Sequence, residues 1–256
     1  MKPTLGIVVA LKSEASPLLG RGRRHWAKRH QARYPLPAGD SHIMITCSGV
    51  GRQNASTAAH KLIAGGIHAL ASVGLAGGLD PRLDAGHVII ATNLLSIQNE
   101  KTEGPWNADP NGVTLARKVL LPEKFFAQCG TVLTTSQEIL TRHHKESLFR
   151  DTRALTVDME SAEVARAASE AHIPFFCLRV VCDPAQTSVP KELSMCLDTY
   201  GNIQLTPVLR HVMRRPSLIV DLFHLTRYFQ SAMPVLGRAW RILMKNDLPH
   251  ERASGV

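Results

Sequence analysis

The chain has 256 residues, 44% of them hydrophobic, which is enough to bury a sizeable core in one large domain or two small ones. Its formal net charge of +9 would suit nucleic acid or anionic lipid, but only 5% of the residues are aromatic and none interleave with the basic runs, which disfavours nucleic acid. No apolar stretch reaches the length of about 18 residues that is typical of a membrane-spanning helix.

The cysteines and the N-terminal segment indicate a cytoplasmic protein. The five cysteines are odd in number and lie mostly in apolar runs, which is typical of reduced core thiols rather than of a disulfide framework. None belongs to a CxxC pair and the histidines lack ligand spacing, so we predict no metal and no cofactor. The first apolar run is short and is followed early by Glu14, which favours a first strand over a signal peptide.

Strands and helices alternate through the first half of the chain. Residues 93–126, rich in Gly, Pro and Asn, interrupt this pattern and predict an irregular loop at the active site or at an oligomer interface. The predicted elements before that loop are a strand over 4–11, a helix opening at Lys12, a strand over 42–47, a helix over 53–64 that stops at Gly65-Gly66, and strands over 68–73 and 87–92.

The pattern resumes after the loop with a strand over 130–135 and a predicted helix start at Thr135 to Glu138. Residues 154–183 then predict a strand, an Ala-rich amphipathic helix to about His172, and an apolar strand after Pro174, which is the pattern of a parallel crossover unit. The fold class is therefore α/β, with three αβα layers around a central mixed, mainly parallel sheet, plus a C-terminal helical extension.

The chain changes character after Pro190. From Leu205 to the end it has eight Lys or Arg residues and three Asp or Glu. Apolar residues recur at helical spacing over 217–229 and 235–244, with Pro234 near a break between the two predicted helices. We divide the chain into a catalytic domain, 1–204, and a basic amphipathic extension, 205–256. The extension either packs as core or lies in a membrane interface with its basic residues at headgroup level.

A second basic cluster is predicted on the first helix. Its members are Arg21, Arg23, Arg24, Lys28, Arg29 and Arg33. A solvated face is the default interpretation of such a cluster.

Polar or glycine-rich segments follow the predicted strands, where ligands collect in open α/β sheets. They are Glu14, Ser48–Gly51 (SGVG), Gly74–Gly78 (GLAGG), Val157–Glu160 (VDME) and Arg179–Asp183 (RVVCD). From the residues alone, Glu160 and Asp183 are either a pair for general acid work and sugar-hydroxyl binding, or a helix N-cap acid and a turn acid. The chain lacks GxxxxGK[ST], and no GxGxxG opens a βαβ unit, so nucleoside triphosphates and dinucleotides are not expected.

Together these motifs resemble the nucleoside phosphorylase and nucleosidase superfamily, and its methylthioadenosine/S-adenosylhomocysteine nucleosidase branch, over about residues 4–183. The resemblance implies that Glu14 activates the attacking water, that Asp183 protonates N7 of the leaving purine, and that Arg179 positions the water. It implies that Met159 packs on the ribose and that Glu160 binds its hydroxyls. The other substrate-binding positions that it implies are Ser48, Gly49, Ala76, Gly77, Gly78 and Ile139.

Departures from the family pattern bear on the nucleophile and the substrate. Ser72 and Leu75 stand where phosphorylases place the Arg and Ser of an RVGS-type segment that holds phosphate, which favours water as the nucleophile. The base-contacting segment, normally SGD(A/Q)F, reads TTSQEI over 134–139 and lacks the Asp. With the basic tail, these departures resemble the hopanoid-associated phosphorylase-like proteins of bacteria. That resemblance implies removal of adenine from adenosylhopane, which leaves ribosylhopane.

The resemblance also implies a homodimer or higher oligomer and a nucleoside-lipid substrate. Such a substrate needs either an apolar channel or an entrance docked on the membrane, and the basic tail leaves open docking to an anionic surface on the inner face of the cytoplasmic membrane. Two alternatives stay open. One is a phosphorylase or nucleosidase acting on a soluble nucleoside of the methylthioadenosine or futalosine type. The other is a catalytically dead binding protein, against which the joint presence of Glu14, Glu160 and Asp183 argues.

Overall fold

A computed structural model describes residues 4–19, 31–35, 42–123, 125–190, 192 and 218–246. Its strands form one nine-stranded sheet in the order β2-β3-β1-β4-β8-β7-β5-β6, with β9 paired to both β4 and β5. The strands are β1 (Thr4–Val9), β2 (Gln31–Pro35), β3 (His42–Cys47), β4 (Ala69–Gly78), β5 (Val88–Gln98), β6 (Lys101–Asn107), β7 (Ala127–Thr135), β8 (Thr156–Asp158) and β9 (Phe175–Asp183).

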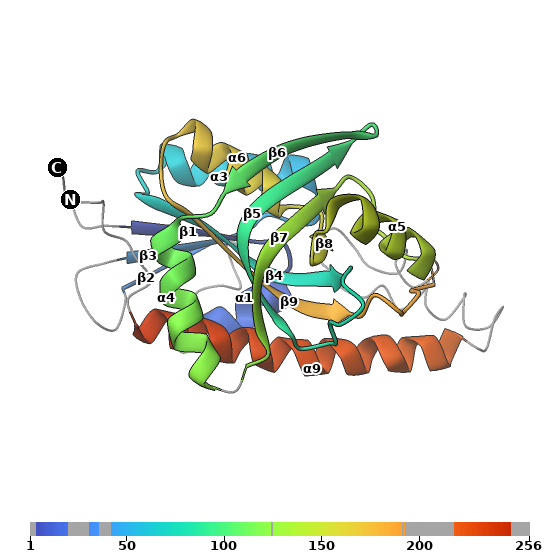
Figure 1. The fold of residues 1–256 in the computed structure, drawn as a ribbon. Coiled ribbons are helices and arrows are strands. Elements are labelled where there is room, and N and C mark those ends of the chain that lie inside the picture. Colours follow the sequence, from blue (N-terminus) through green and yellow to red (C-terminus); the bar gives the residue numbers. More distant parts are fainter. Residues whose placement is uncertain are drawn as a thin grey trace.

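Helices cover the sheet from two sides (Figure 1), which gives the predicted three layers. On one side α3 and α6 pack against each other and against the sheet, and on the other α1, α4 and α9 pack together. The helices are α1 (Lys12–Leu18), α3 (Arg52–Ala64), α4 (Pro110–Leu120), α5 (Arg142–Thr152), α6 (Ser161–Glu170) and α9 (Leu218–Lys245), with a short 3-10 turn at Leu121–Glu123.

The sheet is mixed, and its pairing decides where functional side chains meet. β1 and β9 each run parallel to β4, so the carboxyl ends of these three strands lie at one edge. β8 runs antiparallel to β4, with Gly77 opposite Val157, and parallel to β7. Because β8 is antiparallel to β4 and β9 is parallel to it, the parallel crossover unit predicted over 154–183 was wrong. The turn after β8 still lies near the ends of β4 and β9, because β8 is short and pairs only with Gly77 and Gly78 at the end of β4.

The core consists of aliphatic side chains on both faces of the sheet. β1 and β9 are almost continuously apolar because each is covered by helices on its two faces. The side with α1, α4 and α9 buries Leu236, Trp240 and Leu243 of α9 against β1, β4 and β9. At Gly237 an added Cβ would lie 2.7 Å from Cβ of Pro17, so α9 and α1 approach closely there.

The prediction of an irregular loop over 93–126 was wrong. β5 continues to Gln98 and turns back as β6 through Asn99 and Glu100, both with positive φ. Helix α4 follows, capped by Asp109, whose side chain accepts from the Gly112 amide at 2.7 Å. β6 is mostly exposed, so its sequence lacks the alternation that marks a half-buried strand.

The helix start predicted at Thr135 to Glu138 was also wrong. Those residues end β7 and form a bend, and α5 begins only at Arg142. Its N-cap is Thr141, whose hydroxyl accepts from the His144 amide at 3.3 Å. The bend leaves residues 136–138 exposed.

One helix, α9, replaces the predicted pair in the tail. It runs through Pro234 without a break, because buried side chains on both sides of Pro234 hold it against the core. The first half of α9 leaves Val220 and Phe223 58% and 64% exposed. The proposed boundary at 204/205 lies outside the described residues, and α9 shares a core cluster with β1, β4 and β9.

The predicted basic cluster on the first helix falls mainly outside the described residues. Its last member, Arg33, lies in β2 rather than in a helix. Within the described residues, no helix is both long and apolar enough to cross a membrane.

Candidate active site

A cavity of about 300 Å³ lies where the segments following β1, β4, β8 and β9 converge. Glu14 and Asp183 both line it, although they are far apart in the sequence. The other lining residues are Ala10, Leu11, Val50, Leu75, Ala76, Gly77, Thr135, Gln137, Glu138, Ile139, Leu140, Val157, Asp158, Met159, Glu160, Cys182, Val189, Leu225 and Phe229. The cavity therefore combines several carboxyl groups with largely apolar walls.

Glu14 is held in the first turn of α1 by backbone amides. Leu11 and Ala10 donate to Oε2 at 2.9 and 3.1 Å, and Leu75 donates to Oε1 at 2.7 Å. Burial raises the pKa of Glu14, while these amides and the charge of Arg179 act in the opposite direction. An added Cβ at Gly74 would lie 2.6 Å from Oε1, so only glycine leaves room for this carboxyl group.

Asp183 ends β9 and is paired with a buried lysine. Nζ of Lys145, on α5, lies 2.5 Å from Oδ2 of Asp183. Burial raises the pKa of Asp183, and Lys145 opposes that rise without cancelling it. Gly77 lies opposite Asp183 in the β4–β9 register, where the strands are offset by an irregularity between Ala76 and Gly77.

Glu160 joins the site from the start of α6. Its Oε1 accepts from the Gly51 amide at 2.7 Å, so the glycine-rich turn after β3 supports this carboxyl group. Burial and the nearby charge of Asp158 raise the pKa of Glu160 to about 8. Met159 lines the cavity beside it, and its amide donates to Glu160 Oε2 at 3.2 Å.

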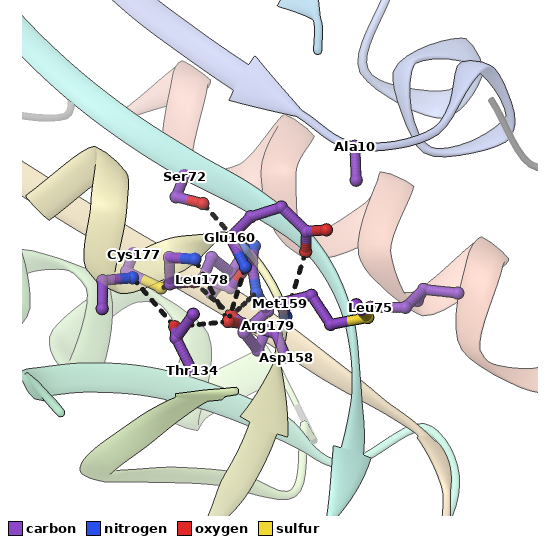
Figure 2. A network of polar contacts seen from close by, with 12 residues as sticks. Ala10, Ser72, Leu75, Thr134, Asp158, Met159, Glu160, Cys177, Leu178 and Arg179 are labelled. Atoms are coloured by element: carbon purple, nitrogen blue, oxygen red, sulfur yellow. Dashed lines mark hydrogen bonds and ion pairs between the residues drawn. The ribbon is translucent and has the colours of Figure 1, made fainter. Parts of the chain in front are cut away.

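A polar network behind the cavity fixes this region (Figure 2). Asp158 accepts from Nε of Arg179 at 2.8 Å and from the Thr134 hydroxyl at 2.7 Å. Arg179 also donates to the Ser72 hydroxyl at 2.7 Å. Burial alone would raise the pKa of Asp158, but Arg179 and the hydrogen bonds hold it below its usual value. This pair is a charge-balanced support for the turn that carries Met159 and Glu160.

The structure brings most of the sequence-predicted site residues to the cavity and sets others apart. Those that line it are Glu14, Ala76, Gly77, Ile139, Met159, Glu160 and Asp183. Those that are not among the lining residues are Ser48, Gly49, Gly78 and Arg179. Val50 takes the place expected of Ser48 and Gly49, because the turn presents its third residue to the cavity and its fourth, Gly51, to Glu160.

Sequence reasoning missed two features of the site. Lys145 lies in the polar run RHHKES, which gives no sign that one of its members points inward. Leu225 and Phe229 of α9 line the cavity, although neither was among the site residues predicted from the sequence. Their spacing of four residues marks one helical face, but it does not identify what that face meets.

The site contains no candidate metal centre among the residues that the structure describes. No group of three or more His, Cys, Asp or Glu side chains is placed there to hold an ion. The chemistry that these side chains offer is proton transfer, with one carboxyl group bonded to amides and another paired with an ammonium.

Comparison with known proteins connects this geometry to a family. A 5′-methylthioadenosine/S-adenosylhomocysteine nucleosidase of Staphylococcus carnosus (strain TM300) is 26% identical over 174 residues, which cover 62% of this chain and 74% of that protein. An aminodeoxyfutalosine nucleosidase of Campylobacter jejuni subsp. jejuni serotype O:2 is 24% identical over 196 residues, covering 71% of this chain and 86% of that protein.

Solved structures share the fold at lower identity. An S-adenosylhomocysteine nucleosidase of Streptococcus pyogenes, in complex with 5-methylthiotubericidin, superposes with a TM-score of 0.70 at 18% identity, covering 97% of this chain and 98% of that one. The futalosine hydrolase of Helicobacter pylori strain 26695 gives a TM-score of 0.69 at 17% identity, covering 95% and 97%. The family model described as the phosphorylase superfamily matches residues 4–204. This chain therefore belongs to the phosphorylase superfamily.

Proposed function

We propose that the protein is a purine nucleosidase that hydrolyses the N-glycosidic bond of a 5′-substituted adenosine. The observation that carries this proposal is the meeting of Glu14 and Asp183 at one cavity, each with different hydrogen-bond partners. Relatives at 24–26% identity are named nucleosidases, which supports the same reaction class.

Each carboxyl group has one task in this reaction. Glu14 accepts a proton from water, whose oxygen bonds to C1′ of the ribose. Asp183 gives a proton to N7 of the purine as the C1′–N9 bond breaks and its electron pair passes to the base. A positioned acid of this kind contributes about 10²–10⁴-fold to the rate. Glu160 accepts from the ribose hydroxyls, and Met159 packs against the sugar.

Water rather than phosphate is the nucleophile in this proposal. Among the described residues that line the cavity there is no Lys or Arg, whereas Glu14 and Glu160 both line it. A phosphate dianion would find no cationic side chain among these lining residues to hold it. Adenine release by dialysed enzyme, with and without phosphate, tests this point, and a strict phosphate requirement would refute hydrolysis.

The reaction itself is tested by replacing the acid. We expect Asp183→Asn to lower kcat for adenine release by about 10²–10⁴-fold with the fold intact, because the amide cannot supply the proton. Circular dichroism and thermal unfolding provide the folding control. Full activity of this variant would refute the assignment of the acid.

For the substrate we propose adenosylhopane, converted to ribosylhopane and adenine in hopanoid biosynthesis. Leu225 and Phe229 of α9, with Ile139, Leu140 and Val189, supply an apolar wall that suits a water-insoluble 5′ group. The runner-up is a soluble nucleoside of the kind that the relatives' names state. Assays of adenine release from adenosine, methylthioadenosine and a 5′-lipid-linked adenosine separate the two, and a preference for methylthioadenosine would favour the runner-up.

We further propose that α9 docks on an anionic membrane surface. The exposed side chains of Val220 and Phe223, together with the basic residues of the same helix, support this proposal. Co-sedimentation with vesicles containing anionic lipid should fall when both residues are replaced by Ser. Equal partitioning of variant and wild type would refute docking.

A homodimer or higher oligomer also remains a prediction, which a measurement of the mass in solution checks.

A further inference from the structure

Lys145 is a fully buried cation that the reaction scheme above leaves without a role. It lies on α5, its side chain is 0% exposed, and it is not among the residues that line the cavity. Its Nζ donates to Oδ2 of Asp183 at 2.5 Å and to the carbonyl oxygens of Pro184 and Thr187 at 3.0 and 3.1 Å. A lysine is seldom buried completely unless its donors are satisfied, and here three oxygen atoms accept from Nζ.

The contacts of Lys145 are concentrated on the segment that carries the acid. The amide of Val189, further along this segment, donates to the Leu140 carbonyl at 2.8 Å, and the Arg142 amide donates to the Ser188 hydroxyl at 3.1 Å. The segment after β9 is thus tied both to α5 and to the bend that precedes it. Within this arrangement, Lys145 is the contact that reaches the carboxyl group itself.

Other ionisable groups also face Asp183. Glu138, in the bend after β7, acts on it with a negative charge, and the Cys182 thiol is its neighbour on β9. Glu14 lines the same cavity from α1. Among these groups Lys145 is the cation, so it favours the carboxylate form of Asp183, whereas burial favours the protonated form.

We propose that Lys145 is a positioning residue for the general acid: it fixes the Asp183 carboxyl group and stabilises the carboxylate that forms as the purine departs. This inference rests on the proposed function and adds a residue to it. Only interactions that strengthen toward the transition state raise kcat. The ammonium meets that condition, because the charge on Asp183 appears during the step.

The proton balance of the step is closed without a further reactant. Asp183 begins protonated and loses its proton to purine N7 as the C1′–N9 bond breaks. The resulting carboxylate is paired with the Lys145 ammonium, which neither gains nor loses a proton. The proton that water gives to Glu14 passes to solvent, and one proton returns from solvent to Asp183, so both groups regain their starting states.

The test uses Lys145→Met, Asp183→Asn and the double variant, with Arg150→Met as the matched control. Arg150 is on the same helix and its side chain is 70% exposed. We expect Lys145→Met to lower kcat for adenine release about 10–100-fold. This loss is smaller than the roughly 10²–10⁴-fold contribution of a positioned acid, because Asp183 itself is still present. The double variant should be no slower than Asp183→Asn, since two residues that act through each other are not additive. Arg150→Met should match the wild type.

Two readouts separate this role from a merely structural one. A p-nitrophenyl riboside needs no proton on its leaving group, so its hydrolysis should be little affected by Lys145→Met. The alkaline limb of the pH profile for purine release should move to higher pH in that variant, because Asp183 holds its proton more firmly without the ammonium. Equal losses on both substrates, or an unmoved limb, would overturn the proposal.

The outcomes distinguish failure of the proposed function from failure of the role proposed for Lys145. If the wild type releases no base from any nucleoside, the proposed function fails and this inference fails with it. If the wild type is active and Lys145→Met equals it, only the role of Lys145 is refuted. Should Lys145→Met be too unstable to assay, Asp183→Asn and the double variant decide, because the double variant removes the buried ammonium and its carboxyl partner together. A further tenfold loss in the double variant would then refute the inference.

Discussion

Two glycines and two acids show how strongly single residues control this site. Gly74 leaves room for Glu14, and Gly51 donates its amide to Glu160. The sequence could indicate these glycines only as members of clusters after strands. Which atom each one accommodates depends on contacts between residues far apart in the chain, and no local pattern encodes those contacts.

Gly74→Ala should disable the base without unfolding the protein. The new methyl group would lie 2.6 Å from Oε1 of Glu14, so the carboxyl group must move away from the Leu75 amide. We expect kcat to fall by about 10²-fold or more. Gly130→Ala is the matched control, since its methyl group would crowd Leu155, away from the cavity. It should lower the thermal midpoint and leave kcat unchanged; similar kcat values for the two variants would contradict the prediction.

Glu160 makes the stability of the protein depend on pH. Its pKa rises from 4.5 to about 8 on folding, so the folded state binds the proton more tightly than the unfolded state. The resulting stabilisation is fully present below about pH 4.5 and is lost as pH rises through 8. Thermal midpoints measured from pH 5 to 9 should therefore fall, and Glu160→Gln should reduce the fall. Glu170→Gln, on the exposed end of α6, should leave the slope as in the wild type.

The elements differ in how well the sequence predicts them. β1, β3 and β9 were expected within two residues of their bounds, because their apolar runs are continuous and end at polar or glycine residues. β6 is exposed and carries no such run. The continuity of α9 across Pro234 was missed because it depends on packing, which outweighs the local cost of a proline.

Helix α9 is expected to select the 5′ group through Leu225 and Phe229. Replacing either by Ala removes apolar surface from the cavity wall, and burying such a side chain is worth about 1.5–3 kcal/mol, roughly 10- to 100-fold in affinity. KM for a 5′-lipid-linked adenosine should rise accordingly, while KM for adenosine changes little. Gln230→Ala, on the same helix, exposed and outside the cavity lining, is the control. An equal effect on both substrates would argue against this role.

Over the whole molecule, Glu14 and Asp183 could be chosen from the sequence because each follows a strand parallel to β4, and the carboxyl ends of parallel strands lie at one edge. The same argument does not place Glu160, because β8 is antiparallel to β4. The role of Arg179 could not, since its pairing with Asp158 and Ser72 forms across three strands. The tail likewise reads as an extension in the sequence, although half of α9 belongs to the core.

Trp240→Ala tests whether α9 is part of the core. The indole is buried between α9 and the sheet, so its removal should lower the free energy of unfolding by about 3–5 kcal/mol. Urea unfolding followed by circular dichroism should show one transition at a lower midpoint. A separate early transition, with the main one unchanged, would mean that the helix unfolds independently of the catalytic domain.

The close approach of Gly237 to Pro17 limits which side chains α9 can carry at position 237. α1 carries Glu14 and rests on α9, which also walls the cavity. Exchanging Leu225 or Phe229 would change the wall of the cavity itself. A side chain larger than glycine at position 237 would instead press on Pro17, in the helix that carries Glu14.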